Sequence, residues 1–388
     1  MAKSRQRPPL SRRKKLVYTG LVLLITLAIL YLLSIIIRSH HRYETTRLRP
    51  GWSGVSHVAD EELGYRPVAG ARLVQSVGTW GEITTWHNAE GFRMVPGTEA
   101  DDPGKRPLIL TLGCSYSYGY STPAEKIYPE LVAGKLEGRC VNASASGYGL
   151  AQMLIRARRL IPRLKPNYVL VQYSPWLPLR SMTHFSITCN IGLIPVPFFF
   201  REGDQVRVHS PVFLTKLHDL PFYDYRNREK SFGDFVSYLC RVGFPSFFYD
   251  DFHYAAYFVK NSVGMVPPTL QDKAAINLAA YGEIAQICRQ HGARMLIVIL
   301  GNGDSLEEEN LAVPEGVVAV DTQKALLRAI PAMSAVEYIK AYHHLESVGG
   351  RVRRVDVHPN SRAHSVIAAA VLRGLEETKE LDPAKQGK

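Results

Sequence analysis

The stretch "LILTLGCSYSYGYS", from Leu108 to Ser121, decides the fold. An apolar run of strand length ends at a glycine and passes directly into Cys114 and Ser115, and small and aromatic residues follow. Such a turn is either an ordinary strand-to-helix connection or one that presents Ser115 as a nucleophile. Residues far along the chain distinguish these two interpretations.

Downstream of Arg106, apolar runs of strand length alternate with helical patterns. The apolar runs are "RPLILTLG", "CVNAS", "NYVLVQYS", "ARMLIVIL" and "GVVAVD". In the helical pattern "EKIYPELVAGKLEG", Pro129 fits only the first turn. The final helical pattern begins at Ser361, which is the predicted N-cap. This alternation predicts a parallel sheet with helices on both faces, in one domain over residues 106–380.

An aromatic-rich insertion over residues 179–268 interrupts this alternation. It contains "PVPFFF", "LPFYDYR" and "FPSFFYDDFHYAAYF", and it is too long for an ordinary loop. One interpretation is an insertion with a small core of its own. The other is a lid or a wall that binds a sugar or an acyl chain. Both can hold together. Asp250, Asp251 and His253 lie close in this sequence, but their spacing alone is weak support for a catalytic role.

The N-terminal region predicts a membrane anchor. Residues 1–15 form a basic tail, and residues 16–37 contain no charged side chain. At about 1.5 Å per residue, such a run is long enough to cross a bilayer. A cleavable signal peptide is the competing interpretation, but no small-x-small cleavage site follows. The excess of Lys and Arg before the run predicts a cytoplasmic N-terminus in the inner membrane and a periplasmic or extracellular catalytic domain. Residues 38–105 are predicted to be a stalk and a small extended segment that packs on the main domain.

The net charge of +12 does not indicate a nucleic-acid partner. Residues 1–49 hold eleven of the 47 Lys and Arg residues and one of the 35 acidic residues, so the remainder carries a net charge of about +2. A nearly neutral body disfavours a nucleic-acid partner. A basic tail beside an apolar run is a topology signal instead.

Five cysteines are present, and their spacing matches no metal-binding motif. They are Cys114, Cys140, Cys189, Cys240 and Cys288. Outside the cytoplasm Cys189 and Cys240 could pair, but the sequence does not decide this, and five buried thiols are the simpler interpretation. No metal and no cofactor is predicted.

Near the C-terminus, "DVHPN" places Asp356 and His358 two residues apart, just before a helix. A histidine that acts as the base for a serine needs a carboxylate to fix its tautomer and to stabilise the imidazolium. This short segment can supply both groups. It therefore predicts a triad of Ser115, Asp356 and His358.

These motifs resemble those of the SGNH (GDSL-type) hydrolases, in the group of bacterial envelope enzymes. The family's nucleophile block, roughly G-D-S-x-[ST]-x-G, is similar to "GCSYSYG", with Ser115 at the nucleophile. Its second block is similar to "NASASGYG", and the resemblance implies that the N–H groups of Gly147 and Ser115 form the oxyanion hole. Its last block is similar to the segment of Asp356 and His358. The resemblance covers residues 106–379 and implies a flavodoxin-like three-layer α/β/α sandwich with about five parallel strands.

The sequence departs from the family pattern at two positions. Cys114 stands where the family has Asp before the nucleophile. The family's third block, G-x-N-D, supplies an Asn as an oxyanion donor, but here "YVLVQYS" runs into "PWLP" and Trp176 lies near that position. Removal of one oxyanion donor typically lowers the rate ~10²–10³-fold. Asn190 is a candidate substitute. "GNGD", from Gly301 to Asp304, follows a later strand and is not counted as the third block.

The resemblance implies a membrane-anchored serine esterase that acts on O-acyl esters, of which O-acetyl is the first candidate. The expected substrate is an acylated envelope glycan or lipid, with envelope polysaccharide machinery as a further candidate partner. Two alternatives stay open. One is an O-acyltransferase that modifies an envelope polysaccharide with the same triad. The other is a catalytically degenerate scaffold that binds a glycan or a partner protein.

Overall fold

The computed structural model describes residues 11–48, 57–76, 82–98, 104–186, 194–216, 231–301, 311, 313–332 and 334–380. Asn190, Cys189 and most of "GNGD" lie outside these residues, and so does most of the basic tail. The described cysteines are free.

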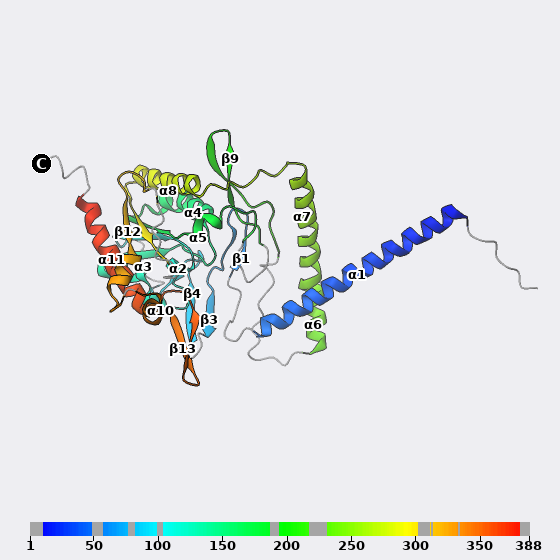
Figure 1. The fold of residues 1–388 in the computed structure, drawn as a ribbon, viewed down its shortest axis with the longest axis horizontal. Helices are drawn as coiled ribbons and strands as arrows, with labels where there is room; N and C mark the ends of the chain where they lie inside the picture. The colour runs from blue at the N-terminus through cyan, green and yellow to red at the C-terminus, as the bar shows by residue number, and fades with distance from the viewer. Residues whose placement is uncertain are drawn as a thin grey trace, which may run out of the picture.

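An eight-stranded sheet forms the centre of the molecule (Figure 1). Its five parallel strands lie in the order β7-β6-β8-β11-β12. Their bounds are β6 Leu108–Leu112, β7 Arg139–Asn142, β8 Tyr168–Tyr173, β11 Arg294–Ile299 and β12 Val318–Asp321. Numbered along the chain, this order is 2-1-3-4-5, which is the flavodoxin-like order. The predicted fold class is confirmed.

Helices cover both faces of this sheet. On one face, α4 (Leu150–Leu164) packs against α8 (Lys273–Gln290). On the other, α11 (Ser361–Glu380) packs against α3 (Tyr128–Lys135) and α9 (Thr322–Arg328). Every residue of β6 and β8 is buried as a result. Strands buried on both faces have continuous apolar sequences, which is the pattern seen in the sequence.

The start of α3 agrees with the sequence-based prediction, and the start of α11 does not. Pro129 lies in the first turn of α3, as its missing N–H requires. The prediction that Ser361 caps α11 is wrong, because the cap is Asn360. The Asn360 side chain accepts a hydrogen bond from the Ala363 N–H at 3.0 Å and also donates to the Ala341 and His343 carbonyls. Asn is at least as good an N-cap as Ser, and these additional bonds fix its side chain.

The segment before the parallel strands joins the main sheet. β3 (Arg72–Ser76), β4 (Glu82–His87) and β5 (Arg93–Met94) continue the sheet antiparallel beyond β7, where Arg93 pairs with Asn142. β1 (His57–Asp60) and β2 (Gly64–Pro67) form a separate hairpin. The sequence predicted a small extended segment packed on the main domain, whereas three of its strands belong to the central sheet.

The remaining elements are short, except for the helix α7. They are α2 Ser115–Tyr118, a 3-10 turn Ala124–Lys126, α5 Trp176–Leu179, β9 Phe198–Glu202, β10 Gln205–His209, α6 Phe232–Tyr238, a π-helical turn Leu239–Gly243, α7 Phe244–Ser262, α10 Ala335–Tyr342, β13 His344–Val348 and β14 Arg351–Asp356. β13 and β14 form an antiparallel hairpin that projects from the body (Figure 1).

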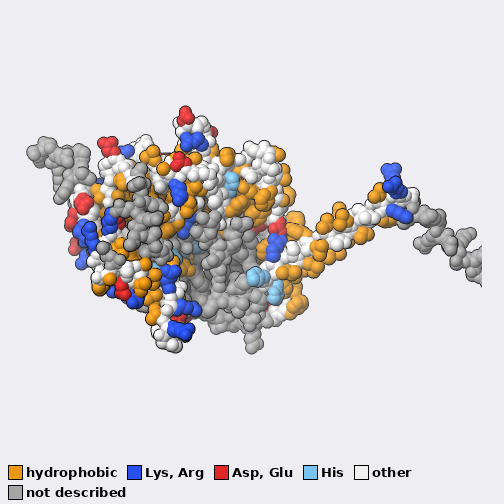
Figure 2. Space-filling view, viewed as in Figure 1, with side chains coloured by type: hydrophobic (Ala, Val, Ile, Leu, Met, Phe, Trp, Pro, Cys, Tyr) orange, Lys and Arg blue, Asp and Glu red, His pale blue; other side chains and the backbone are white. Residues whose placement is uncertain are grey.

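The N-terminal helix α1 runs from Arg12 to Leu48 and projects far from the body (Figure 1). The part from Arg12 to His41 is long and apolar enough to cross a membrane, and almost none of it is buried against the protein. Figure 2 shows hydrophobic side chains along its projecting part and Lys and Arg at its start. Only the end near the body is packed, against α6 and α7.

Several aromatic rings of the insertion pack on one another. Phe185 meets Tyr257 at 5.0 Å between ring centroids, and Phe213 meets Tyr254 at 4.9 Å. Asp250 is buried beneath them and accepts hydrogen bonds from Thr215 Oγ1 and the Lys216 N–H. These contacts are those of a small core.

Candidate active site

The candidate nucleophile stands at the carboxyl end of β6. After Leu112 the chain turns through Gly113 and Cys114 into the short helix α2, which starts at Ser115. A side chain at Gly113 would meet the Gln172 side chain at 2.6 Å, so only glycine fits this turn. Ser115 is 5% exposed, and its hydroxyl donates to Cys114 Sγ at 3.9 Å. The turn holds Ser115 at the edge where ligands bind in open α/β sheets.

Gln172 holds this turn from the neighbouring strand β8. Its Oε1 accepts from the N–H of Cys114 at 2.9 Å and from the hydroxyl of Ser117 at 2.8 Å. Its Nε2 donates to Cys114 Sγ at 3.1 Å and to Ser174 Oγ at 2.8 Å. Both ends of a fully buried amide are therefore used, and the backbone on either side of Ser115 is fixed. A polar residue inside the apolar run "YVLVQYS" was the one signal in the sequence that pointed to this role.

The structure brings Asp356 and His358 together at the end of β14. His358 Nδ1 lies 2.5 Å from Asp356 Oδ1, and the His358 backbone N–H donates to the same oxygen at 3.0 Å. The Ser121 hydroxyl donates to the other carboxylate oxygen. With Nδ1 turned toward Asp356, Nε2 is the ring nitrogen left for proton transfer.

The carboxyl group of Asp356 is ionised at neutral pH. Burial by itself raises its pKa, but the hydrogen bonds and charge of His358 and the hydrogen bond of Ser121 outweigh burial and lower the pKa to about 2. An anionic Asp356 stabilises an imidazolium beside it. This is the property required of the carboxylate in a serine triad.

His358 packs on two tyrosines that follow Ser115 in the chain. Its ring centroid lies 5.1 Å from that of Tyr116 and 4.7 Å from that of Tyr120. The Tyr116 hydroxyl also donates to the Val357 carbonyl at 3.3 Å. Within the described residues, no hydrogen bond joins Ser115 Oγ to His358. The two segments are thus in contact, and catalytic hydrogen bonds often close only when substrate is bound.

Two backbone N–H groups near Ser115 are free to act as oxyanion donors. In the described part of the chain, the N–H groups of Ser115 and Gly147 make no hydrogen bond. Gly147 has a φ of +79°, a conformation that favours glycine, in the turn that follows β7. Asn142, at the end of β7, donates to the Ser117 carbonyl at 2.9 Å and ties this turn region to α2.

Trp176, which the sequence places near the position of the family's third-block Asn, follows β8. It begins α5, and its ring lies 5.1 Å from the ring of Tyr116. Its indole Nε1 is buried and has no hydrogen-bond partner among the described residues. Buried donors are usually paired, so an unpaired indole N–H is unusual. Its place beside the nucleophile segment makes it a candidate hydrogen-bond donor to a ligand. Asn190, the other candidate, lies outside the described residues.

Arg93 supports the loop behind the site, a role that nothing in the sequence indicates. It is 2% exposed, and its guanidinium donates to the carbonyls of Tyr118 at 2.8 Å, Gly119 at 2.5 Å and Thr122. This loop carries Ser121, which binds Asp356. Thr122 Oγ1 also donates to the Pro359 carbonyl at 3.0 Å. Strand β5 therefore positions the link between the nucleophile segment and the Asp356–His358 segment.

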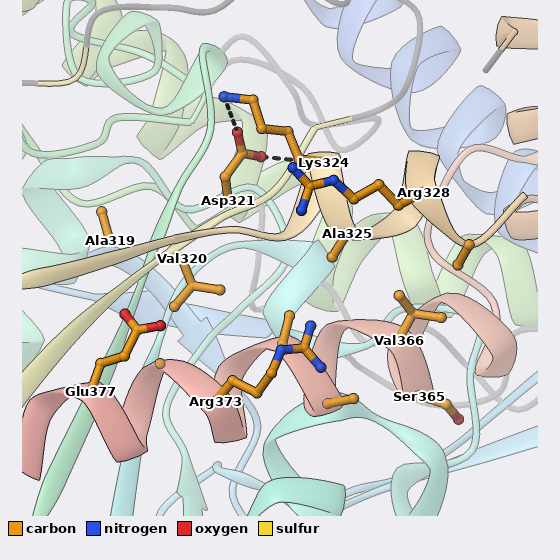
Figure 3. A pocket seen from close by; sticks show the side chains of 14 residues that line it. Ala319, Val320, Asp321, Lys324, Ala325, Arg328, Ser365, Val366, Arg373 and Glu377 are labelled. Atoms are coloured by element: carbon orange, nitrogen blue, oxygen red, sulfur yellow. Dashed lines mark hydrogen bonds and ion pairs between the residues drawn. The ribbon is translucent and has the colours of Figure 1, made fainter.

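A cavity of about 640 Å³ lies elsewhere, between α9, α11 and the edge strand β12 (Figure 3). Figure 3 shows Arg328 and Arg373 on opposite sides of it and Lys324 paired with Asp321. None of Ser115, Asp356 and His358 lines it. The candidate active site is therefore separate from this cavity.

No protein-family model and no curated protein sequence matches the chain. Three solved structures that it matches are a catalytic mutant of the acetylxylan esterase Axe2 from Geobacillus stearothermophilus, the psychrotrophic esterase EstA from Pseudoalteromonas sp. and a member of the lipolytic protein G-D-S-L family from Veillonella parvula. The identities are 13%, 11% and 10%, over 70%, 71% and 69% of this chain and 95%, 100% and 96% of those chains. The TM-scores are 0.35, 0.31 and 0.31, so the assignment of the fold depends on the strand order. The fold is the flavodoxin-like three-layer α/β/α sandwich that the resemblance to SGNH (GDSL-type) hydrolases implies, and the solved structures similar to the chain include esterases and members of the G-D-S-L family.

Proposed function

We propose that this protein is a membrane-anchored serine ester hydrolase with the triad Ser115, His358 and Asp356. The observation that carries the proposal is the contact between the Asp356–His358 pair and Tyr116 and Tyr120, which follow Ser115 at the carboxyl end of the parallel strands. A turn residue and an unrelated capping histidine would have no reason to meet in this way.

The proposed reaction proceeds through an acyl-enzyme. Ser115 Oγ attacks the ester carbonyl carbon and transfers its proton to His358 Nε2, while Asp356 stabilises the imidazolium. The N–H groups of Ser115 and Gly147 bind the negative charge that develops on the carbonyl oxygen. The C–O bond to the alcohol then breaks, and the alcohol leaves with the proton from His358. Water then gives a proton to His358 Nε2 and attacks the acyl carbon. The bond from that carbon to Ser115 Oγ breaks, the acid is released, and the proton returns to Ser115 Oγ.

The proposed substrate is an O-acyl ester, with O-acetyl as the first candidate, on a glycan or lipid of the cell envelope. Support comes from α1, which is long and apolar enough to keep the catalytic domain at a membrane. The excess of basic residues before α1 supports a cytoplasmic N-terminus and a periplasmic or extracellular domain. Partners in envelope polysaccharide modification would meet the enzyme on that side.

Labelling with a fluorophosphonate probe tests the proposed nucleophile. The full chain in detergent should form a covalent adduct, and Ser115→Ala should abolish it. Ser210→Ala, which changes an exposed serine after β10, should label like the wild type. Absence of label on the wild-type protein would contradict the proposal and favour a degenerate binding scaffold. A donor ester supplied with and without a glycan acceptor then separates hydrolysis from O-acyl transfer, because only a transferase places the acyl group on the glycan.

A further inference from the structure

Helix α7 exposes an apolar stripe that no described part of the protein covers. Phe244, Phe248, Phe252, Val259 and Val263 are 38%, 55%, 65%, 64% and 64% exposed. At about 100° of rotation per residue, their positions fall within an arc of roughly 100° on the helix. The preceding helix α6 adds two more exposed apolar side chains, Phe232 and Val236. A continuous exposed surface of this kind marks an interaction site.

α7 is anchored to the body through its opposite side and to α1 along one border of the stripe. Its residues Ser246, Phe247, Asp250 and Tyr257 are buried. Asp251 forms a two-pronged ion pair with Arg38 of α1, at 2.9 Å and 2.6 Å, and it accepts a hydrogen bond from the Tyr31 hydroxyl at 3.0 Å. The Arg38 guanidinium also lies 4.7 Å from the centroid of the Phe247 ring. The apolar stripe is therefore held in a fixed position relative to α1.

The point of contact on α1 places α7 at a membrane boundary. The part of α1 from Lys15 to Ser34 extends roughly 28 Å at about 1.5 Å per residue, which matches the ~30 Å hydrocarbon core of a bilayer. α7 contacts α1 in the last turn of this part, at Tyr31, and just beyond it, at Arg38, and Figure 1 shows α7 crossing α1 rather than running along it. Tyr and Arg are residues that favour the headgroup level.

The stripe faces the side of the body from which α1 projects. Figure 2 shows hydrophobic side chains on the edge of the body over α7, next to the base of the projecting helix. If α1 crosses a bilayer, this edge meets the surface of the same bilayer. An amphipathic helix in that position buries its apolar face ~5–10 Å deep at the boundary between headgroups and acyl chains.

We propose that α6 and α7 form an interfacial membrane-binding element, whose apolar stripe inserts into the leaflet from which α1 emerges. This inference depends on the anchoring role of α1 in the proposed function. It means that the catalytic domain is held against the lipid surface in one orientation, instead of moving freely at the end of a stalk. The occupant of the stripe is lipid.

Tryptophan quenching by lipid tests the proposal on the full chain in liposomes. Phe248→Trp and Val259→Trp place an indole on the stripe, and wild-type emission is subtracted for the native tryptophans. In lipids brominated near the carbonyl end of the acyl chains, we expect the added emission to be shifted to shorter wavelength and mostly lost. Two stripe positions are used so that, if one variant misfolds, the other still tests the proposal. Val336→Trp is the matched control, since Val336 is 60% exposed on α10, outside the stripe, and should keep its emission.

Extraction with alkaline carbonate separates the two possible failures. Release of the full chain from the liposomes would refute the anchoring role of α1, whatever the quenching shows. Retention without quenching at residues 248 and 259 would overturn the interfacial element alone and leave fluorophosphonate labelling unaffected. Retention, no quenching and a cross-linked dimer through the stripe would mean that a second copy covers it, which also overturns the proposal.

Discussion

Replacement of Gln172 by leucine should disable the site without removing any residue that touches the substrate. Leucine is close in size to glutamine but has no acceptor for the Cys114 N–H and no donor for Cys114 Sγ or Ser174 Oγ. The Ser117 hydroxyl keeps a partner, because Tyr128 OH lies 2.7 Å away. Two buried N–H groups, those of Cys114 and Ser117, are thus left unpaired, which lowers the free energy of unfolding by about 3 kcal/mol.

The catalytic effect of Gln172→Leu should exceed what this loss of stability explains. The amide fixes the backbone on either side of Ser115, and a shift of about 1 Å in a nucleophile can cost ~10²-fold in rate. We therefore expect kcat to fall by about 10²-fold while KM changes little, because the substituted side chain lies beneath the turn.

The assay combines ester hydrolysis by the full chain in detergent with thermal unfolding followed by circular dichroism. Gln290→Leu is the matched control, since Gln290 is exposed at the end of α8 and should leave both kcat and Tm unchanged. A Gln172→Leu protein with wild-type kcat would refute the reasoning, because it would show that the turn keeps its geometry without the amide.

Asp356→Asn should lower kcat by about 10⁴-fold with the fold retained, because the imidazole loses the anion that fixes its tautomer. The carboxylate pKa of about 2 lies below its unfolded value of 3.8, so the stability that this group contributes is present above pH ~4 and lost as the pH falls toward 2. Between pH 6 and pH 2, the free energy of unfolding should thus fall by about 2 kcal/mol more in the wild type than in the variant. Parallel plots of the free energy of unfolding against pH for the two proteins would contradict this. Trp176→Phe keeps a ring against Tyr116 but removes the unpaired indole N–H. If that N–H replaces the third-block Asn, kcat should fall ~10²-fold with little change in KM, whereas an unchanged kcat would exclude the indole as a donor.

The parallel part of the fold could be predicted because its signals are local. The apolar runs of β6, β8 and β11 are buried on both faces. Such strands can be recognised from their own sequences, without knowing which strands they pair with. Pro129 marked the first turn of α3 in the same way. The Asp356–His358 pair was also local, because its two members are joined by a single residue.

The rest depended on contacts between distant parts of the chain. Nothing near Arg93 in the sequence indicates that its strand pairs with β7 or that its side chain reaches the loop after α2. The cap of α11 was misplaced by one residue because both Asn360 and Ser361 are good caps, and only the tertiary bonds of Asn360 decide between them. Gln172 stood out as a polar residue in an apolar strand, but the sequence did not reveal its partners Cys114 and Ser117, which lie after the neighbouring strand β6.

The burial of Arg93 sets a limit on how the chain can be shortened for crystallography or expression. A version that starts at residue 106, where the motif-bearing part begins, would retain Ser115, Asp356 and His358 but delete β3, β4 and β5. The carbonyls of Tyr118, Gly119 and Thr122 would lose their donor, and the edge of β7 would be left unpaired. Cleavage between α1 and β1, by contrast, would keep the Arg93 contacts to this loop, and its cost would be the Arg38–Asp251 ion pair that holds α7. The chain from β1 onward should therefore be kept together, and a shortened version should start before His57.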